Sequence, residues 1–350
     1  MVFHFGFRRY RLPLRSPLRT AHGPWAEREG LLVRLVDEAG RSGFGEVAPV
    51  PWFGTETLAE AEEACRGLGG KVSAKVLDAV PERFGCVRFA LACARVEVER
   101  LALKAPSRTQ SGDSALGATR STSSRLPVAA LLTAGRAALQ ELRAKLETGF
   151  LAFKWKVGVE RAEDELGVLD DLLAALPGYA KLRLDANGAW DRRAAARWLE
   201  RCAERPVEFV EQPVAPADED ALLGLAQDYP VTLALDESVV RLAEARRWQS
   251  QGWPGVFVIK PVLCGPLPEI EAWVRESKAD IVLSSAIETA AGRAAILPWA
   301  VGSGVTKRAL GFGVGEVFAE DKWNGPVLGA RADAGWAHGV NLEELWTALS

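Results

Sequence analysis

The sequence contains few of the residues that mark a zinc, disulfide-bonded or membrane protein. Its 350 residues include only three histidines, and its five cysteines are scattered and form no CxxC pair. Neither a zinc site nor a disulfide framework is indicated, and this pattern suits a reducing cytoplasm. No apolar run approaches the ~20 residues of a membrane span, and the N-terminus has no apolar signal segment. We therefore expect a soluble, unprocessed, cytoplasmic protein.

Strong charge of either sign is also missing. The formal net charge is −3, with no strongly basic block, so nothing favours nucleic acid or a membrane surface as a partner. Apolar residues make up 48% and charged residues 25%, as in an ordinary globular protein with a large core. A small-molecule partner fits best, and the sequence leaves the oligomeric state open.

What the chain does contain is a series of polar residues at nearly equal intervals. These residues are Lys156, Asp185, Glu211, Asp236, Lys260 and Ser285. The gaps between them are 29, 26, 25, 24 and 25 residues, and nearly every one lies near the end of a short apolar run. About 25 residues accommodate one strand, one helix and two loops, so the period predicts a parallel β/α barrel. The carboxyl ends of barrel strands meet at one mouth, where we expect these side chains.

Four parts are predicted along the chain. Residues 1–104 show strand patterns followed by helical ones, typical of a small α+β domain. Residues 105–125 are rich in Ser, Thr and Gly, which indicates a linker or surface loop. Residues 126–312 alternate strand and helix patterns and form the predicted barrel. Residues 313–350 have no clear period, and we expect them to pack back on the first domain.

The barrel strands are predicted from short apolar runs that amphipathic helical patterns separate. They lie near residues 127–133, 150–157, 181–186, 207–212, 232–237, 255–260, 280–285 and 308–312.

Three acids end consecutive predicted strands. Asp185, Glu211 and Asp236 supply hard oxygen ligands of the kind that Mg²⁺ prefers. Three unpaired carboxylates this close repel one another at neutral pH, so the cluster makes sense when a cation lies within it. No His or Cys accompanies them, so Mg²⁺, with Mn²⁺ as a substitute, fits better than zinc. The alternative is three isolated, solvated acids at strand ends.

Lysines flank these acids. Lys154 and Lys156 alternate along one predicted strand, so both point into the barrel, and mutual repulsion would lower their pKa values until one can remove a proton. Lys260 follows a later strand, across the mouth from Lys156. Two lysines on opposite sides of a metal-held substrate suit proton transfer beside a carboxylate, with the metal and lysine charges stabilising an enediolate. The alternative is a pair of snorkelling lysines at an exposed strand end.

Four further residues are candidates for substrate binding or support. Arg183 and Asn187 share a face with the first acid and could orient ligands, or could be barrel-layer and loop residues. Ser284 and Ser285 begin a segment in which a strand runs into a helix N-terminus, where N–H groups and hydroxyls bind anions. Simple N-capping is the alternative. Glu237 points to the other face, and we expect it to be a structural ion-pair partner.

These motifs resemble the enolase superfamily, and within it the muconate-lactonizing subgroup. The resemblance lies in Lys154-x-Lys156 on the second strand, acids on the third to fifth, and Lys260 on the sixth. Gly43-Phe-Gly-Glu46 with Pro49 looks like the signature of the N-terminal domain. The resemblance implies a (β/α)₇β TIM-like barrel with an α+β capping domain. It also implies that capping-domain loops at 20–25 and 50–54 close over the substrate.

A finer resemblance implies the reaction. Leu182-Arg-Leu-Asp-Ala-Asn-Gly188 and Val210-Glu-Gln-Pro213 look most like the members that serve menaquinone or phylloquinone biosynthesis. Such a member is a Mg²⁺-dependent lyase that dehydrates a succinyl-hydroxycyclohexadiene carboxylate to an aromatic acid. Lys156 would be its base and Lys260 the cation that faces the enediolate.

Other activities of the same superfamily stay open. An N-succinylamino acid racemase would use the same two lysines. Dipeptide epimerases usually carry an Asp-x-Asp motif beyond the last strands, where this chain has Gly311-Phe-Gly-Val-Gly-Glu316. Sugar-acid dehydratases commonly recruit a histidine, which the predicted strands lack. A catalytically silent barrel used for binding is the alternative from another class.

Overall fold

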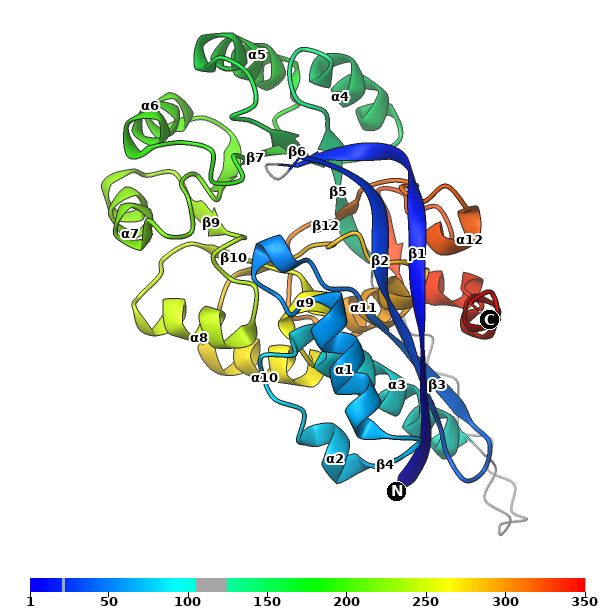
Figure 1. The fold of residues 1–350 in the computed structure, drawn as a ribbon. Coiled ribbons are helices and arrows are strands. Elements are labelled where there is room, and N and C mark those ends of the chain that lie inside the picture. Colours follow the sequence, from blue (N-terminus) through cyan, green and yellow to red (C-terminus); the bar gives the residue numbers. More distant parts are fainter. Residues whose placement is uncertain (21–22, 105–124, 350) are drawn as a thin grey trace, which may run out of the picture.

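The N-terminal part of the chain forms an antiparallel sheet with helices on one side (Figure 1). The structure, a computed structural model, describes residues 1–20, 23–104 and 125–349. The sheet has the order β3-β2-β1-β4. Its strands are β1 (Val2–Thr20), β2 (Gly23–Val36), β3 (Ser42–Val47) and β4 (Lys71–Ser73). Of the predicted linker at 105–125, only Arg125 lies among the described residues.

Close packing on this sheet explains two of its glycines. The helical elements here are η1 (Pro51–Phe53), α1 (Leu58–Leu68), α2 (Ala74–Asp78) and α3 (Gly85–Lys104). A Cβ atom on Gly43 or Gly45 would lie 2.0 Å from a backbone carbonyl oxygen of α3, that of Ala94 or Ala90. Only glycine allows β3 and α3 to come this close. The two glycines of the Gly-Phe-Gly-Glu46 motif therefore lie where β3 and α3 are in closest contact.

The second part is a closed ring of parallel strands with helices outside it (Figure 1). Its strands are β5 (Arg125–Leu132), β6 (Ala152–Lys156), β7 (Lys181–Asp185), β8 (Val207–Glu211), β9 (Leu233–Leu235), β10 (Val256–Ile259), β11 (Ile281–Leu283) and β12 (Leu310–Gly313). Consecutive strands from β5 to β11 pair in parallel, and β12 pairs with β5. A parallel bridge from Ser284 to Gly311 joins the two remaining edges. The predicted barrel fold is confirmed.

The helices of the barrel connect successive strands, as in other β/α barrels. They are α4 (Ala138–Glu147), α5 (Ala162–Ala175), α6 (Arg192–Cys202), α7 (Glu219–Asp228), α8 (Leu242–Ser250), α9 (Pro261–Cys264), α10 (Leu267–Ser277) and α11 (Ala290–Ser303). Among the described helices, none is both long and apolar enough to cross a membrane.

The C-terminal segment contacts both parts. Its elements are α12 (Asp321–Asn324), β13 (Arg331–Asp333), η2 (Ala334–Gly339) and α13 (Leu342–Thr347). β13 pairs with β5 of the barrel, and Phe318 forms an antiparallel bridge with Leu14 of β1. Arg8 of β1 donates a hydrogen bond to the Trp346 carbonyl at 2.7 Å and stacks over its ring.

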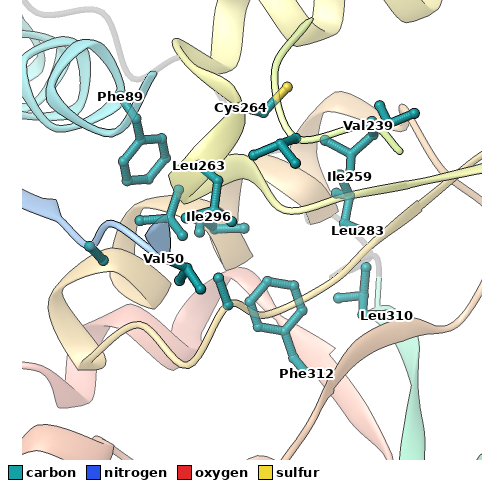
Figure 2. Packing of buried hydrophobic residues seen from close by; sticks show 14 of the residues in the cluster. Val50, Phe89, Val239, Ile259, Leu263, Cys264, Leu283, Ile296, Leu310 and Phe312 are labelled. Carbon is teal, nitrogen blue, oxygen red and sulfur yellow. The ribbon is translucent and has the colours of Figure 1, made fainter. Parts of the chain in front are cut away.

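One apolar core continues across the two parts. Figure 2 shows Val50 and Phe89 of the N-terminal part beside Leu263, Ile296 and Phe312 of the barrel, in the same cluster. All five side chains are almost fully buried. Burial of this kind is the main favourable term in packing one unit on another, so the N-terminal part is fixed over the barrel.

Candidate active site

The three predicted acids lie in register at the carboxyl ends of neighbouring strands. Asp185 pairs with Glu211 across β7 and β8, and Glu211 pairs with Ala234, two residues before Asp236. Their exposed fractions are 7%, 1% and 4%. Burial, and next the charge of Asp185, raise the pKa of Glu211 well above its ordinary value. The structure therefore brings together three buried acids that repel one another.

Two ammonium groups lie among these acids. The Lys154 Nζ atom is 2.8 Å from Asp185 Oδ2 and 2.7 Å from Glu211 Oε1. Lys260 forms an ion pair with Asp236. Burial alone would lower the pKa of Lys154, but the charges of the acids, Asp185 first, raise it. The acids thus favour the charged form of Lys154 in this arrangement, and the expectation that repulsion keeps the pKa of both lysines low is wrong for Lys154.

The donor set fits a hard divalent cation. Among residues 1–20, 23–104 and 125–349, no three Asp, Glu, His or Cys side chains already surround a position for an ion. The ammonium groups explain this, since Lys154 and Lys260 bind oxygens of all three acids. Three buried carboxylates, with no imidazole or thiolate among their contacts in the described part of the chain, match Mg²⁺ rather than zinc.

The lysines predicted to move protons belong to opposite strands. Lys156 ends β6, where its Cα pairs with that of Asp185, and Lys260 directly follows β10. In a ring that runs in order from β5 to β12, β6 and β10 are four strands apart. The two residues therefore belong to opposite sides of the mouth.

Asn187 and Glu237 form a bonded pair beside the acids. The Asn187 amide donates to Glu237 Oε1 at 3.1 Å, and its backbone N–H donates to Asp185 Oδ1 at 3.1 Å. Burial, then the charges of Asp236 and Asp185, raise the pKa of Glu237 to about 7. Its second oxygen is buried without a hydrogen-bond partner. The predictions that Glu237 faces away and forms a structural ion pair are both wrong.

Arg183 lies elsewhere in the barrel. Its guanidinium donates to Glu208 Oε2 at 2.7 Å and to the Ala309 carbonyl at 2.8 Å. Glu208 lies near the start of β8 and Ala309 precedes β12, so both are at the amino ends of strands. The structure gives Arg183 the role of a buried barrel-layer residue and does not bring it to the acids.

The hydroxyls of the two serines bond to neighbouring protein groups. Ser285 Oγ donates to Glu288 Oε1 at 3.0 Å and accepts from the Ile287 N–H at 3.0 Å. Ser284 Oγ donates weakly to the Gly311 carbonyl at 3.4 Å. At the start of α11, where the sequence predicted binding of an anion, the Thr289 N–H donates to the Glu46 carboxylate of β3 at 2.9 Å.

Gln212 holds the last acid in place and was not predicted. Its Oε1 accepts from the backbone N–H groups of Asp236 and Ser238 at 3.1 and 3.2 Å, and its Nε2 donates to Ser238 Oγ at 2.9 Å. The side chain is fully buried, and its φ of 39° is left-handed. The only sequence signal was its place directly after Glu211, in Glu-Gln-Pro.

Part of the N-terminal domain covers the mouth. The Phe53 ring of η1 lies 4.7 Å from Lys260 Nζ, and Trp52 packs edge-on against Trp25 at 5.0 Å. The loop at 50–54, predicted to close over the substrate, thus contacts a predicted catalytic lysine.

Comparisons with known proteins agree with this geometry. Residues 4–98 match the MenC N-terminal domain, and residues 137–300 match the family described as enolase C-terminal domain-like. The o-succinylbenzoate synthase of Thermosynechococcus vestitus is 41% identical over 348 residues, which cover 98% of each chain. This chain belongs to the o-succinylbenzoate synthase family. The predicted place in the enolase superfamily is confirmed.

More distant members of the o-succinylbenzoate synthase family and solved structures agree. The Yersinia enterocolitica enzyme is 32% identical over 81% of this chain and 82% of its own. The crystal structure of the Thermosynechococcus elongatus enzyme, with Mg in its active site, has a TM-score of 0.81 at 39% identity and covers 99% of both chains. The L-Ala-D/L-Glu epimerase of Bacillus subtilis has a TM-score of 0.77, but its 20% identity over 95% of this chain and 96% of its own shows the fold alone.

Proposed function

We propose that the protein is a Mg²⁺-dependent lyase that dehydrates succinyl-hydroxycyclohexadiene carboxylate to o-succinylbenzoate. One observation carries this proposal. Three buried acids and two lysines on opposite strands meet at one barrel mouth, in a chain that is 41% identical to an o-succinylbenzoate synthase over 98% of its length. Asp185, Glu211 and Asp236 would hold the metal. When bound, Mg²⁺ supplies positive charge to the substrate carboxylate and so acidifies the adjacent C–H group.

The two lysines have different roles. The Lys156 amine removes the proton from the ring carbon that bears the carboxylate, and Lys260 faces the negative charge that develops there. The bond from carbon to the hydroxyl oxygen then breaks, and the departing oxygen takes a proton from the Lys156 ammonium and leaves as water. The ring becomes aromatic, which makes the step favourable. General acid–base catalysis of this kind contributes a factor of about 10² to 10⁴.

The protein would serve menaquinone or phylloquinone biosynthesis in the cytoplasm. The aromatic acid that names the family supports the pathway. The five cysteines support the compartment, because each is free and buried in a chain of this size, as is usual where thiols stay reduced. A small-molecule carboxylate is the only partner that this proposal requires.

The activity can be tested directly. Purified protein with Mg²⁺ should convert the diene acid to the aromatic acid, measured by absorbance, and a Lys156→Ala variant should not. N-succinyl amino acids in D₂O, followed by NMR, are the second arm of the assay. Deuterium exchange at the α-carbon without dehydration of the diene acid would contradict the proposal and identify a racemase.

A further inference from the structure

One carboxylate of the N-terminal domain caps the N-terminus of a barrel helix. Glu46 of β3 is fully buried and accepts hydrogen bonds from the Tyr10 hydroxyl at 2.6 Å and the Thr289 hydroxyl at 2.7 Å. It also accepts from the backbone N–H groups of Thr289 at 2.9 Å and Gly292 at 2.8 Å. Three of these four donors belong to the first turn of α11 or its cap. The contact therefore joins the two domains through one charged group.

A helix start attracts such a group. The first N–H groups of a helix have no partner within it, and the helix dipole places partial positive charge there. Thr289 satisfies one of them, since its hydroxyl accepts from the Ala291 N–H at 3.2 Å. A Cβ atom on Gly292 would lie 2.9 Å from Glu46 Oε2, so a side chain here would push the carboxylate away. The sequence at the helix start is thus adapted to a carboxylate from the other domain.

A second residue of the N-terminal domain holds the segment just before this helix. The Arg28 guanidinium of β2 is 2% exposed and donates to the Ile287 carbonyl at 3.1 Å and the Pro49 carbonyl at 2.7 Å. Ile287 has a φ of 60°, a left-handed conformation that β-branched residues rarely adopt. Such backbone persists only where the surroundings hold it in place. Glu46 and Arg28 therefore hold residues 287–292 at two points.

This segment forms an edge of the mouth. It follows directly from Ser284 and Ser285, whose backbone N–H groups donate to the Ile259 and Gly311 carbonyls at 2.8 and 3.1 Å. Ser285 then bonds to Glu288, which leads into the cap at Thr289. Thr289, which Glu46 contacts, is thus only five residues along the chain from Ser284 at the wall of the site.

We propose that Glu46 is a positioning residue: by capping α11 from the other domain it fixes residues 284–289, so that substrate binding depends on docking of the N-terminal domain. The part that concerns substrate rests on the proposed function. Glu46 itself does not touch the acids or lysines of the site. Its removal should loosen the edge of the mouth and leave metal binding and the proton-transferring groups in place.

The test uses the full chain with Mg²⁺ and compares Glu46→Ala and Glu46→Gln with Glu343→Gln. Glu343 is a matched control, because it also joins the N-terminal sheet to the rest of the chain, through Arg34 at 3.2 Å, but is 57% exposed. In Glu46→Ala, amide hydrogen exchange of residues 284–292 should become at least tenfold faster. KM for the diene acid should rise on the order of tenfold with kcat within about threefold, a loss of ~1.4 kcal/mol in binding. For Glu46→Gln, both the exchange rate and KM should lie between those of wild type and Glu46→Ala.

Two results would overturn the proposal. In the first, Glu46→Ala lowers only the melting temperature, and its exchange and KM match those of Glu343→Gln. In the second, exchange at 284–292 rises but KM is unchanged. If Glu46→Ala fails to fold, Glu46→Gln and Thr289→Val, which removes one donor, should raise KM in the same direction, and unchanged values count against the proposal. If wild type does not dehydrate the diene acid, the proposed function fails, and the exchange comparison alone decides whether Glu46 holds the segment.

Discussion

The Lys154 ammonium lies between Asp185 and Glu211, 2.8 Å from one carboxylate and 2.7 Å from the other. Both acids are nearly inaccessible to solvent, so their charges interact strongly with any cation that reaches them. Without a metal this lysine supplies the positive charge between the acids. Lys154 and the metal therefore neutralise the same two carboxylates, and the contribution of each to the stability of the protein should depend on the other.

Lys154→Met should destabilise the protein most when metal is removed. Loss of one partner of a buried ion pair costs about 3 to 5 kcal/mol, because the other charges stay buried and unpaired. Mg²⁺ should restore much of that loss. Urea unfolding in EDTA measures the loss of stability without metal, and unfolding in excess Mg²⁺ measures how much of it the metal restores. The control is Lys322→Met, which removes an exposed ion pair to Glu320 at 2.9 Å. An equal loss in both buffers would contradict this dependence.

Glu211→Gln should abolish the stabilisation by Mg²⁺. A metal at 100 times its Kd stabilises a folded protein by about 2.7 kcal/mol, which should raise the melting temperature of wild type. The amide removes a ligand charge, and it also removes the cost of burying that charge and its repulsion by Asp185, which together raise the pKa of Glu211. Lys154 keeps its ion pair with Asp185. The metal-free variant should therefore melt no lower than metal-free wild type. Thermal melts with and without Mg²⁺ test this, with Glu219→Gln, at a half-buried acid paired with Arg247, as control.

Lys156→Ala should lose dehydration activity by a factor of about 10² to 10⁴, the usual contribution of a general base. The three acids are untouched, so the rise in melting temperature with Mg²⁺ should persist. Lys260→Ala should behave in the same way. Steady-state kinetics beside thermal melts separate the two effects. A variant that loses metal binding together with activity would show that the lysine holds the site together rather than acting on the substrate.

Phe53→Ala should weaken substrate binding and remove the contact of the aromatic ring with the Lys260 ammonium. A ring face 4.7 Å from an ammonium contributes about 0.5 to 2 kcal/mol, more when solvent is excluded. Phe53→Leu is the matched control, since it keeps apolar bulk over Lys260 but has no aromatic face. If the interaction with the ring matters, both variants should lose kcat/KM. If Phe53→Leu has wild-type kinetics, Phe53 only covers the mouth and its aromatic face does not matter.

None of the cysteines should react in the native protein. All five are buried, and burial raises the pKa of Cys65, Cys202 and Cys264 to about 12. At pH 8 the thiolate fraction of such a thiol is on the order of 10⁻⁴, and the thiolate is the reactive form. A disulfide-exchange reagent should titrate no thiol before unfolding and five after it. Rapid reaction of one thiol in the native state would contradict its burial.

The sequence predicted the barrel because each of its units repeats the same local pattern. A period near 25 residues placed the acids at strand ends, and the ends of parallel strands in a closed ring meet whatever the details of packing. Arg183 shows the limit of such reasoning. Its face was predicted, but a long side chain can extend toward either end of the barrel, and Glu208 draws it to the amino ends.

The predicted face of Glu237 is wrong for a related reason. The prediction continued the alternation of a strand through residue 237, but β9 ends at Leu235. Beyond that residue the chain turns, and a period of two no longer assigns a face. Asn187 and Gln212 then hold Glu237 and Asp236 through hydrogen bonds that depend on the turn.

The sequence by itself determined the repeat, the acids and lysines at the strand ends, and the family, because these depend on residue types at short, regular spacings. Only the tertiary structure decided that Lys154 bridges two acids and that Glu46 caps α11, 243 residues further along the chain. Contacts between residues so distant form when two surfaces of the folded chain pack together. No local pattern records which carboxylate will meet which helix, since shape and burial across the domain interface make that choice.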